Sequence, residues 1–349
     1  MMTSTFILLL LFFLLLIGLS YWISTLLLYS RRQPITRTPT AYGLAYEDVN
    51  FRSKDGLLLK GWWLPAVTAN ASAPVIVLLH PHFGNRHGLS VQHQGRPRLF
   101  DTDVDLLKMA QACHRAGFTV FMFDFRSHGE SQRGLCAGGL TEDQDVMGAV
   151  DYVFQRMAET TVNPAVGIIG FGLGAAAALA AVGREKGGAE VIRVFSGDSE
   201  GGSGFITIPP PTVKRLRFLV AVQPASLGVL LHGYLHTVAR PLAWVLPPLV
   251  DKFCQWRGGY PLAATFLLKC VQEAHVPVLY LHARSDPWDD GREVQRFYDA
   301  TPGVKQINWI EESFGRLETY AYVTEQPALV LALAAQHIAV KIRVPPYPC

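Results

Sequence analysis

The stretch VGIIGFGLGAAAAL, residues 166–179, decides how this chain folds. A short apolar run rich in β-branched residues is typical of a buried strand, and an alanine-rich helical segment follows it directly. The glycines between them predict a sharp strand-to-helix turn, because glycine adopts backbone conformations that other residues avoid. Gly172 stands at the tip of this turn, so the tip carries no reactive side chain.

Apolar runs and helical segments alternate along the rest of the chain. Continuous hydrophobicity predicts strands that are buried on both faces. We therefore expect an α/β fold with a doubly wound, mostly parallel sheet, whose ligands bind beyond the carboxyl ends of the strands. The predicted core strands are residues 74–80, 118–125, 165–171, 191–195 and 276–282, and the predicted helices are 103–116, 142–157, 174–186, 290–300 and 325–343.

A long segment, residues 197–272, interrupts this alternation. It contains a glycine-rich stretch, three consecutive prolines and the apolar run 227–250. An insertion of this length between core strands is typical of a cap or lid over a pocket. Arg240 and Pro241 break the apolar run, so we do not expect a second membrane-spanning helix there.

The N-terminal segment is the most apolar part of the chain. Residues 6–29 carry no charge, and about 20 apolar residues suffice to cross a bilayer as a helix. A cleaved signal peptide needs a basic start, a shorter apolar core and a small-residue cleavage site, none of which is evident. We predict a single-pass anchor in the lipid bilayer, with Arg31, Arg32 and Arg37 keeping the globular domain in the cytoplasm.

These observations divide the chain into four parts. They are a transmembrane anchor at 1–30, a linker at 31–45, an α/β domain at 46–344 with the cap at 197–272, and a tail at 345–349.

Composition excludes several functional classes. The net charge of +3 comes without a basic stripe, so no nucleic acid is expected as a partner. The five cysteines are scattered and lack the spacing of a zinc site or a disulfide framework. No metal and no cofactor are therefore expected.

From about Tyr46 to Val344 the chain resembles the α/β-hydrolase fold superfamily, in its membrane-anchored bacterial serine-peptidase and acyl-hydrolase branch. Five motifs occur in the order of that family, and together they cover most of the chain after the anchor. They are LLHPHFGNR at 78–86, like the oxyanion loop; DFRSHGES at 124–131; GFGLG at 170–174, like the nucleophile elbow; LHARSDP at 281–287, like the segment bearing the acid; and ESFGRLETY at 312–320, like the loop bearing the histidine.

The resemblance implies a triad of serine, histidine and acid, together with backbone N–H groups that hold an oxyanion. Gly172 stands at the position of the nucleophilic serine and Arg316 at the position of the histidine, so only the acid, Asp286, remains. Removing the serine or the histidine from such a triad costs about 10⁶ in kcat. The resemblance places His80, His82, Phe83 and Leu173 around the oxyanion site and the pocket.

A buried aspartate without its histidine needs another partner. Arginine offers a charge-assisted one, so we expect an ion pair between Asp286 and Arg316 that closes the site, with a solvent-facing Arg316 as the alternative. The sequence thus favours a non-catalytic pseudoenzyme that binds a membrane protein or an apolar small molecule.

Two alternatives stay open. The first is an active ester or acyl hydrolase with a non-standard site, because an oxyanion hole and binding alone retain about 10³–10⁴ of rate over water. The second is a dinucleotide-binding protein, since Gly170, Gly172 and Ala175 fit the G-x-G-x-x-A pattern.

Overall fold

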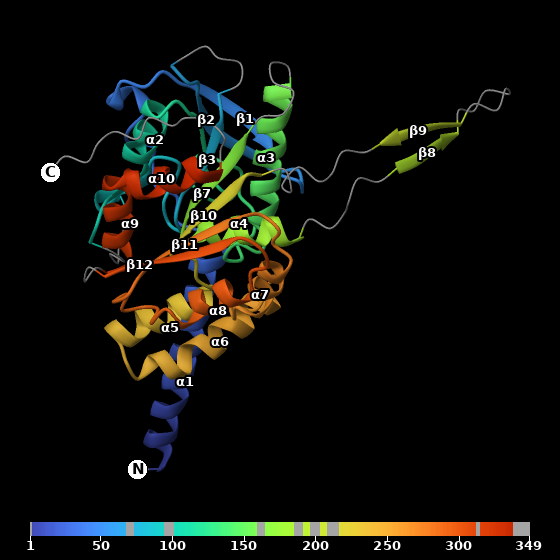
Figure 1. Ribbon diagram of the computed structural model, residues 1–349. Helices are drawn as coiled ribbons and strands as arrows, with labels where there is room; N and C mark the ends of the chain where they lie inside the picture. The colour runs from blue at the N-terminus through green and yellow to red at the C-terminus, as the bar shows by residue number, and fades with distance from the viewer. Residues whose placement is uncertain are drawn as a thin grey trace.

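An eight-stranded sheet forms the centre of the protein (Figure 1). The structure is a computed structural model that describes residues 2–67, 73–93, 101–158, 165–184, 191–195, 203–207, 216–311 and 315–337. The predicted tail at 345–349 lies outside these residues.

The strands follow the order β1-β2-β6-β3-β7-β10-β11-β12. The pairs β1/β2 and β2/β6 are antiparallel, and every later pair in this order is parallel. The predicted α/β fold with a mostly parallel sheet is therefore confirmed. The strands are β1 (Glu47–Arg52), β2 (Leu58–Leu64), β3 (Val75–Leu79), β6 (Thr119–Phe123), β7 (Val166–Phe171), β10 (Phe218–Val222), β11 (Val278–Ala283) and β12 (Lys305–Ile310).

Helices cover both faces of this sheet, as expected of a doubly wound fold. One apolar core lies between the sheet and α3, α4, α7 and α8, and a second lies between the opposite face and α2, α9 and α10. These helices are α2 (Leu106–Arg115), α3 (Asp143–Ala158), α4 (Leu173–Arg184), α7 (Thr265–Gln272), α8 (Arg292–Ala300), α9 (Arg316–Glu325) and α10 (Pro327–His337). The small elements are η1 (Pro39–Tyr42), β4 (Gly88–Leu89), η2 (Val91–His93) and β5 (Val104–Asp105).

The predicted core strand at 191–195 is wrong. This segment is β8 (Val191–Phe195), and among the described residues it pairs with β9 (Ser203–Thr207) alone, in a separate two-stranded sheet. The place between β7 and β11 belongs to β10, which lies inside the segment predicted as a cap. The two runs differ in one respect that explains the outcome: β8 carries Arg193, whereas all five residues of β10 are apolar and buried.

The C-terminal elements also differ from the prediction. The strand β12 was missed because its sequence, KQINWI, mixes polar and apolar residues, as suits a half-exposed edge strand. The helix predicted at 325–343 is preceded by α9, and a new helix begins at Pro327. Proline favours the first turn of a helix, which explains the break after Gln326.

The cap consists of α5 (Leu227–Val238) and α6 (Leu242–Trp256), and the N-terminal helix α1 (Met2–Leu28) packs against it. In the described residues, α1 alone is long and apolar enough to cross a bilayer. A third apolar core joins α1 to the cap through buried residues such as Leu28, Leu231 and Leu246. The helix α1 and the cap therefore form one packed unit. Figure 1 shows the N-terminus of α1 projecting beyond α5 and α6.

The predicted linker also packs on the domain. The Asn85 side chain donates to the carbonyl oxygens of Gln33 and Pro34, and Gln33 accepts from the Ser90 amide. Arg32 donates to the carbonyl of Ser131. These contacts fix the position of α1 relative to the sheet.

Deleting residues 2–28 should expose the apolar core of the cap and destabilise the protein. Each fully buried leucine stabilises the folded state by about 1.5–3 kcal/mol. We expect a lower midpoint of thermal unfolding and stronger binding of an apolar dye than in full-length protein, both measured in the same detergent. Deletion of residues 2–12, which are not part of that core, is the matched control. Equal stability of the two truncated proteins would show that α1 does not support the cap.

Candidate functional site

The glycine turn predicted at 170–174 connects β7 to α4. A Cβ atom at Gly170 would lie 2.6 Å from the backbone nitrogen of Ala175, and one at Gly174 would lie 2.8 Å from the carbonyl oxygen of Leu79. Real Cβ contacts are longer, so both positions require glycine. Gly172 has a φ of +51°, the left-handed conformation that favours glycine. Its amide donates to the carbonyl of Val222 at 2.9 Å, which holds the turn against β10.

The hydroxyl of Tyr320 occupies the space beside Gly172. A Cβ atom at position 172 would lie 2.5 Å from this oxygen and 3.2 Å from the ring carbon that bears it. Tyr320 is buried on α9, so its ring cannot swing freely into solvent. A serine at position 172 would therefore displace Tyr320 before it could act as a nucleophile.

Arg316, the first residue of α9, forms the predicted ion pair with Asp286. Its Nε lies 3.1 Å from Oδ2 of Asp286, and both side chains are buried. The N–H does not point at the carboxylate, so the contact is electrostatic rather than a hydrogen bond. Burial disfavours the charge on Arg316, but Asp286, Tyr320 and Asp289 together outweigh it and raise the pKa of Arg316. The alternative of a solvent-facing Arg316 is thus excluded.

The guanidinium of Arg316 also links α9 to the end of β10. Its Nη1 donates to the carbonyl of Gln223 at 2.9 Å and to the hydroxyl of Tyr320 at 3.2 Å. The Gln223 side chain donates back to the carbonyl of Arg316 at 3.1 Å. Burial raises the pKa of Tyr320, so its hydroxyl keeps its proton at neutral pH. This oxygen accepts from Arg316, and its own proton remains to be donated.

A second carboxylate, Asp289, lies behind this pair. Its Oδ2 is 3.9 Å from Nη2 of Arg316 and 3.2 Å from Nε2 of His282. Burial raises the pKa of Asp289, but the hydrogen bond from His282 and the charge of Arg316 outweigh it and lower this pKa. The positive charge of Arg316 is therefore shared by two buried carboxylates.

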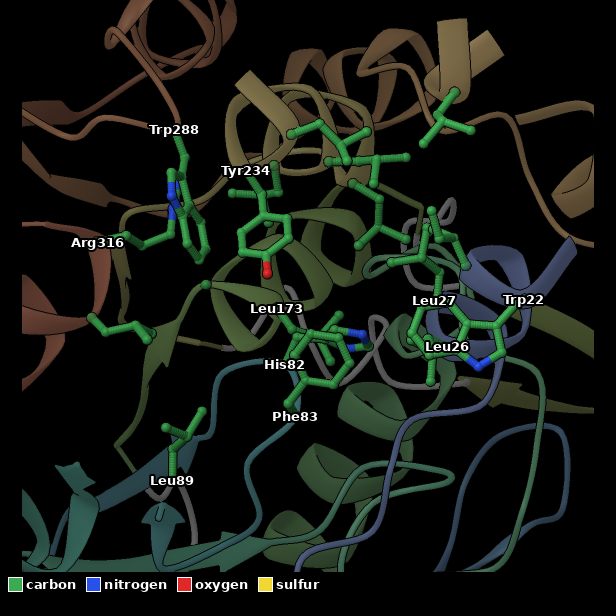
Figure 2. Close-up of a pocket in the computed structure, with 18 of the residues that line it drawn as sticks. Trp22, Leu26, Leu27, His82, Phe83, Leu89, Leu173, Tyr234, Trp288 and Arg316 are labelled. Carbon is green, nitrogen blue, oxygen red and sulfur yellow. The ribbon is translucent and has the colours of Figure 1, made fainter. Parts of the chain in front are cut away.

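An apolar cavity of about 280 Å³ lies over the turn, between the sheet, the cap and α1. Figure 2 shows Trp22, Leu26 and Leu27 of α1 on one side, with Tyr234 and Trp288 on another and His82 and Phe83 on the opposite wall. The hydroxyl of Tyr234 points into the space toward Leu173 and His82. The remaining lining residues are Leu19, Ile23, Leu89, Gly172, Leu227, Leu230, Leu231, Leu235, Leu242, Leu246, Arg316, Leu317 and Tyr320.

The segment predicted as an oxyanion loop follows β3. His80 does not reach the cavity: its Nε2 accepts from the amide of Phe125 at 3.1 Å, and burial lowers its pKa to about 3. His82 lines the cavity, and its two ring nitrogens are buried without a hydrogen-bond partner in the described structure. Burial lowers the pKa of His82 well below its usual value. His82 therefore lines the cavity as an uncharged ring whose donor and acceptor are not used by the described residues.

Buried ion pairs hold this loop in place. Asp124 accepts from the backbone amide of Arg86 at 2.7 Å and from its guanidinium at 2.6 Å. Arg126 pairs with Asp145 in the same way, at 2.7 Å. None of these four residues lines the cavity, so they act as scaffold.

The structure thus brings most of the predicted site residues together. Gly172, Leu173, His82, Phe83 and Arg316 line the cavity, whereas His80 lies outside it. Asp286 lies behind Arg316 and faces a polar groove between the cap and α8.

Sequence reasoning missed Tyr320, Gln223, Asp289 and His282. Tyr320 follows Arg316 by four residues, and this spacing places two side chains on one face of a helix. If the start of a helix at Arg316 had been predicted from the sequence, Tyr320 would have been placed on the same helix face and identified as a site residue. Gln223 and His282 carry no comparable signal, because only the order of the strands brings them to the site.

The structure offers little to a metal or a dinucleotide. Within the described ranges, no three His, Cys, Asp or Glu side chains converge as metal ligands would. A pyrophosphate would need the space beside Gly172 that Tyr320 fills, and Arg316 is already paired. These contacts argue against dinucleotide binding at this turn.

Replacing Arg316 by leucine should destabilise the protein strongly. The substitution leaves Asp286 and Asp289 buried without their cation, and breaking a buried pair in this way costs about 3–5 kcal/mol. Protonation removes the unpaired charges, so the difference from wild type should shrink as the pH falls from about 7 to 5. Denaturant unfolding at both pH values measures this. The control is Arg316→Leu combined with Asp286→Asn, which should recover part of the loss at pH 7. Unchanged stability of the single variant would contradict the ion pair.

Comparisons with known proteins agree with this fold. The family model described as serine aminopeptidase, S33, matches residues 104–315. Protein YfhR of Escherichia coli K12, itself uncharacterised, is 28% identical over 200 residues, which are 54% of this chain and 62% of that protein. Protein YqkD of Bacillus subtilis 168, also uncharacterised, is 25% identical over 191 residues, 55% of this chain and 53% of its own. The chain thus spans less than two thirds of the curated relatives it matches.

Solved structures share the fold at low identity. The esterase Pf2001 of Pyrococcus furiosus superposes with a TM-score of 0.60 at 18% identity, over 88% of this chain and 99% of its own. The α/β hydrolase GrgF from Penicillium superposes with a TM-score of 0.54 at 15% identity, over 85% of this chain and 100% of its own. Together with the family match over residues 104–315, the sheet, the glycine turn and the cap place this chain in the S33 serine aminopeptidase family of α/β hydrolases.

Proposed function

We propose that this chain is a membrane-anchored, non-catalytic member of its family that binds an uncharged apolar molecule. The contact between Tyr320 and the turn at Gly172 carries this proposal. The hydroxyl of Tyr320 occupies the space that the side chain of a nucleophile at position 172 would need, and Arg316 stands where a base would be needed. A guanidinium cannot accept a proton near neutral pH, so it cannot activate a hydroxyl.

The lining of the cavity supports the absence of hydrolysis. Its described side chains include no serine, threonine, cysteine, lysine or carboxylate. The groups that hydrolases use as nucleophile and orienting acid are therefore not available inside the cavity.

The same lining defines the ligand. Arg316 is already neutralised by Asp286 and Asp289, which lie behind it, so an anionic head in the cavity would meet a cation that is already paired. The oxygen of a neutral ester, alcohol or amide can instead accept a hydrogen bond from the hydroxyl of Tyr320 or form one with the ring of His82. At about 280 Å³ the cavity lies near the lower end of small-molecule sites, which favours one short chain.

The packing of α1 supports a retained anchor. Cleavage of a signal peptide would remove α1 and expose the core that it shares with the cap. The cavity would also lose the wall formed by Trp22, Leu26 and Leu27. With Arg31 and Arg32 following α1, the positive-inside tendency favours a cytoplasmic domain.

A fluorophosphonate probe tests the lack of catalysis. Wild-type protein should remain unlabelled, since Gly172 has no side chain to react. Gly172→Ser alone should also remain unlabelled, because Tyr320 crowds the new side chain and Arg316 provides no base. Gly172→Ser combined with Arg316→His and Tyr320→Phe should be labelled at position 172, because nucleophile, base and Asp286 then act as a unit.

The matched control is the same triple variant with Asp286→Asn, in which labelling should fall. Stoichiometric labelling of wild-type protein at any residue would overturn the proposal in favour of a hydrolase with a non-standard site. A folded triple variant that stays unlabelled would show that positions 172 and 316 do not correspond to nucleophile and base.

A further inference from the structure

The length of α1 that extends beyond the cap is too short to cross a bilayer. Residues 4–15 are all exposed, and Leu16 is the first buried residue of the helix. At 1.5 Å per residue, these twelve residues cover about 18 Å. The hydrocarbon core of a bilayer is about 30 Å thick. If α1 spans the membrane, roughly the next eight residues lie in hydrocarbon as well, at the level where α1 packs on the cap.

The position of Arg257 indicates where the hydrocarbon ends. Its guanidinium donates to the hydroxyls of Ser24 and Thr25 and lies over the rings of Tyr21 and Tyr29. Arginine and tyrosine gather at the membrane interface, where the aromatic ring is buried and the polar end is wet. Counting about 20 residues back from this level reaches Phe6, the first residue of the uncharged apolar run.

The outer face of α6 has the composition of an interfacial helix. Trp244 and Trp256, near its two ends, are 73% and 77% exposed, and Val245 is 44% exposed. Exposed cations on the same part of the cap are Lys252 and the preceding Arg240. The nearby Asp251 accepts hydrogen bonds from the Leu262 amide and the Gln255 side chain.

The orientation of α6 fits the same arrangement. Figure 1 shows α5 and α6 lying across α1 rather than along it. α6 is therefore not aligned with the direction in which α1 would cross the membrane. Tryptophans at both ends with lysine and arginine between and beside them are typical of helices that lie in the interface.

We infer that the exposed face of α6, consisting of Trp244, Val245, Lys252 and Trp256, is a second membrane-binding surface. This inference rests on the proposed anchor. The partner is a lipid bilayer: the two tryptophans and Val245 enter the boundary between headgroups and chains, while Arg240 and Lys252 face anionic headgroups. Because α6 packs against α1, the two helices together would seat the cap in the membrane.

Spin-label accessibility in lipid nanodiscs tests this surface. The full-length protein with Cys349→Ser is labelled at Val245→Cys or Trp256→Cys and placed in nanodiscs of phosphatidylcholine and phosphatidylglycerol. The four cysteines that remain are buried, and protein with Cys349→Ser alone measures any background labelling. Leu9→Cys on the exposed half of α1 is the lipid reference. Val304→Cys is the water reference, because it is exposed and precedes β12, at the end of the sheet opposite the cap.

Labels at 245 and 256 should collide with oxygen several-fold more often, relative to a water-soluble nickel complex, than the label at 304. If labels at 245 and 256 give the same ratio of oxygen to nickel collisions as the label at 304, while the label at 9 is exposed to lipid, the second surface is overturned. The proposed anchor is not affected by that result. Low collision with both reagents would indicate a protein contact and would also overturn it. A water-exposed label at 9 would overturn the anchor and this inference together.

Quenching of native tryptophan fluorescence by brominated lipids provides a second measurement that needs no label. Trp22 on α1 is 41% exposed and lies near the same level, so the measurement uses Trp22→Phe protein as its reference. Adding Trp244→Phe and Trp256→Phe to this reference should remove most of the quenching at the shallow bromine position. Retention of this quenching in the resulting triple variant would contradict the proposed surface.

Discussion

The buried pair of Arg316 and Asp286 is the interaction on which the rest of the site depends. It holds the start of α9 against the loop after β11, and this position brings Tyr320 over Gly172. Gln223 at the end of β10 joins the same guanidinium. The carboxyl ends of three neighbouring parallel strands and the first turn of α9 are thus connected through one cation. Under the proposed assignment of Gly172 and Arg316, the site where an active member of the fold transfers a proton from serine to histidine holds a fixed charge in this chain.

The N-terminal helix, which we propose as the anchor, also contributes to the site. It shares an apolar core with the cap and forms one wall of the cavity. A ligand that leaves the bilayer along α1 would meet Leu19, Trp22 and Leu26 before it reaches the glycine turn. This arrangement connects the proposed anchor with the proposed ligand, because both depend on the same apolar face.

The sequence predicted those features that arise from local pattern. The sheet, the glycine turn and the apolar helix follow from short-range hydrophobicity, and the pairing of Asp286 with Arg316 follows from the cost of an unpaired buried charge. The choice between residues 191–195 and 218–222 as a core strand could not be made from hydrophobicity alone, although Arg193 was a signal against the first. The contact of Tyr320 with Gly172 and the packing of α1 on α6 were not predictable, because residues far apart in the sequence form them.

The fate of a neutral, single-chain ester offered to the full-length protein in nanodiscs tests the central claim most directly. Native mass spectrometry reports whether the ester is bound, and product analysis reports whether it is cleaved. The account predicts a complex with intact ester and no acid or alcohol beyond that formed with empty nanodiscs. It also predicts weaker binding when Leu230→Trp fills the cavity, with Val304→Trp as the matched control. The account would be contradicted if the wild-type protein released product above the background of empty nanodiscs and the Arg316→Leu variant released less.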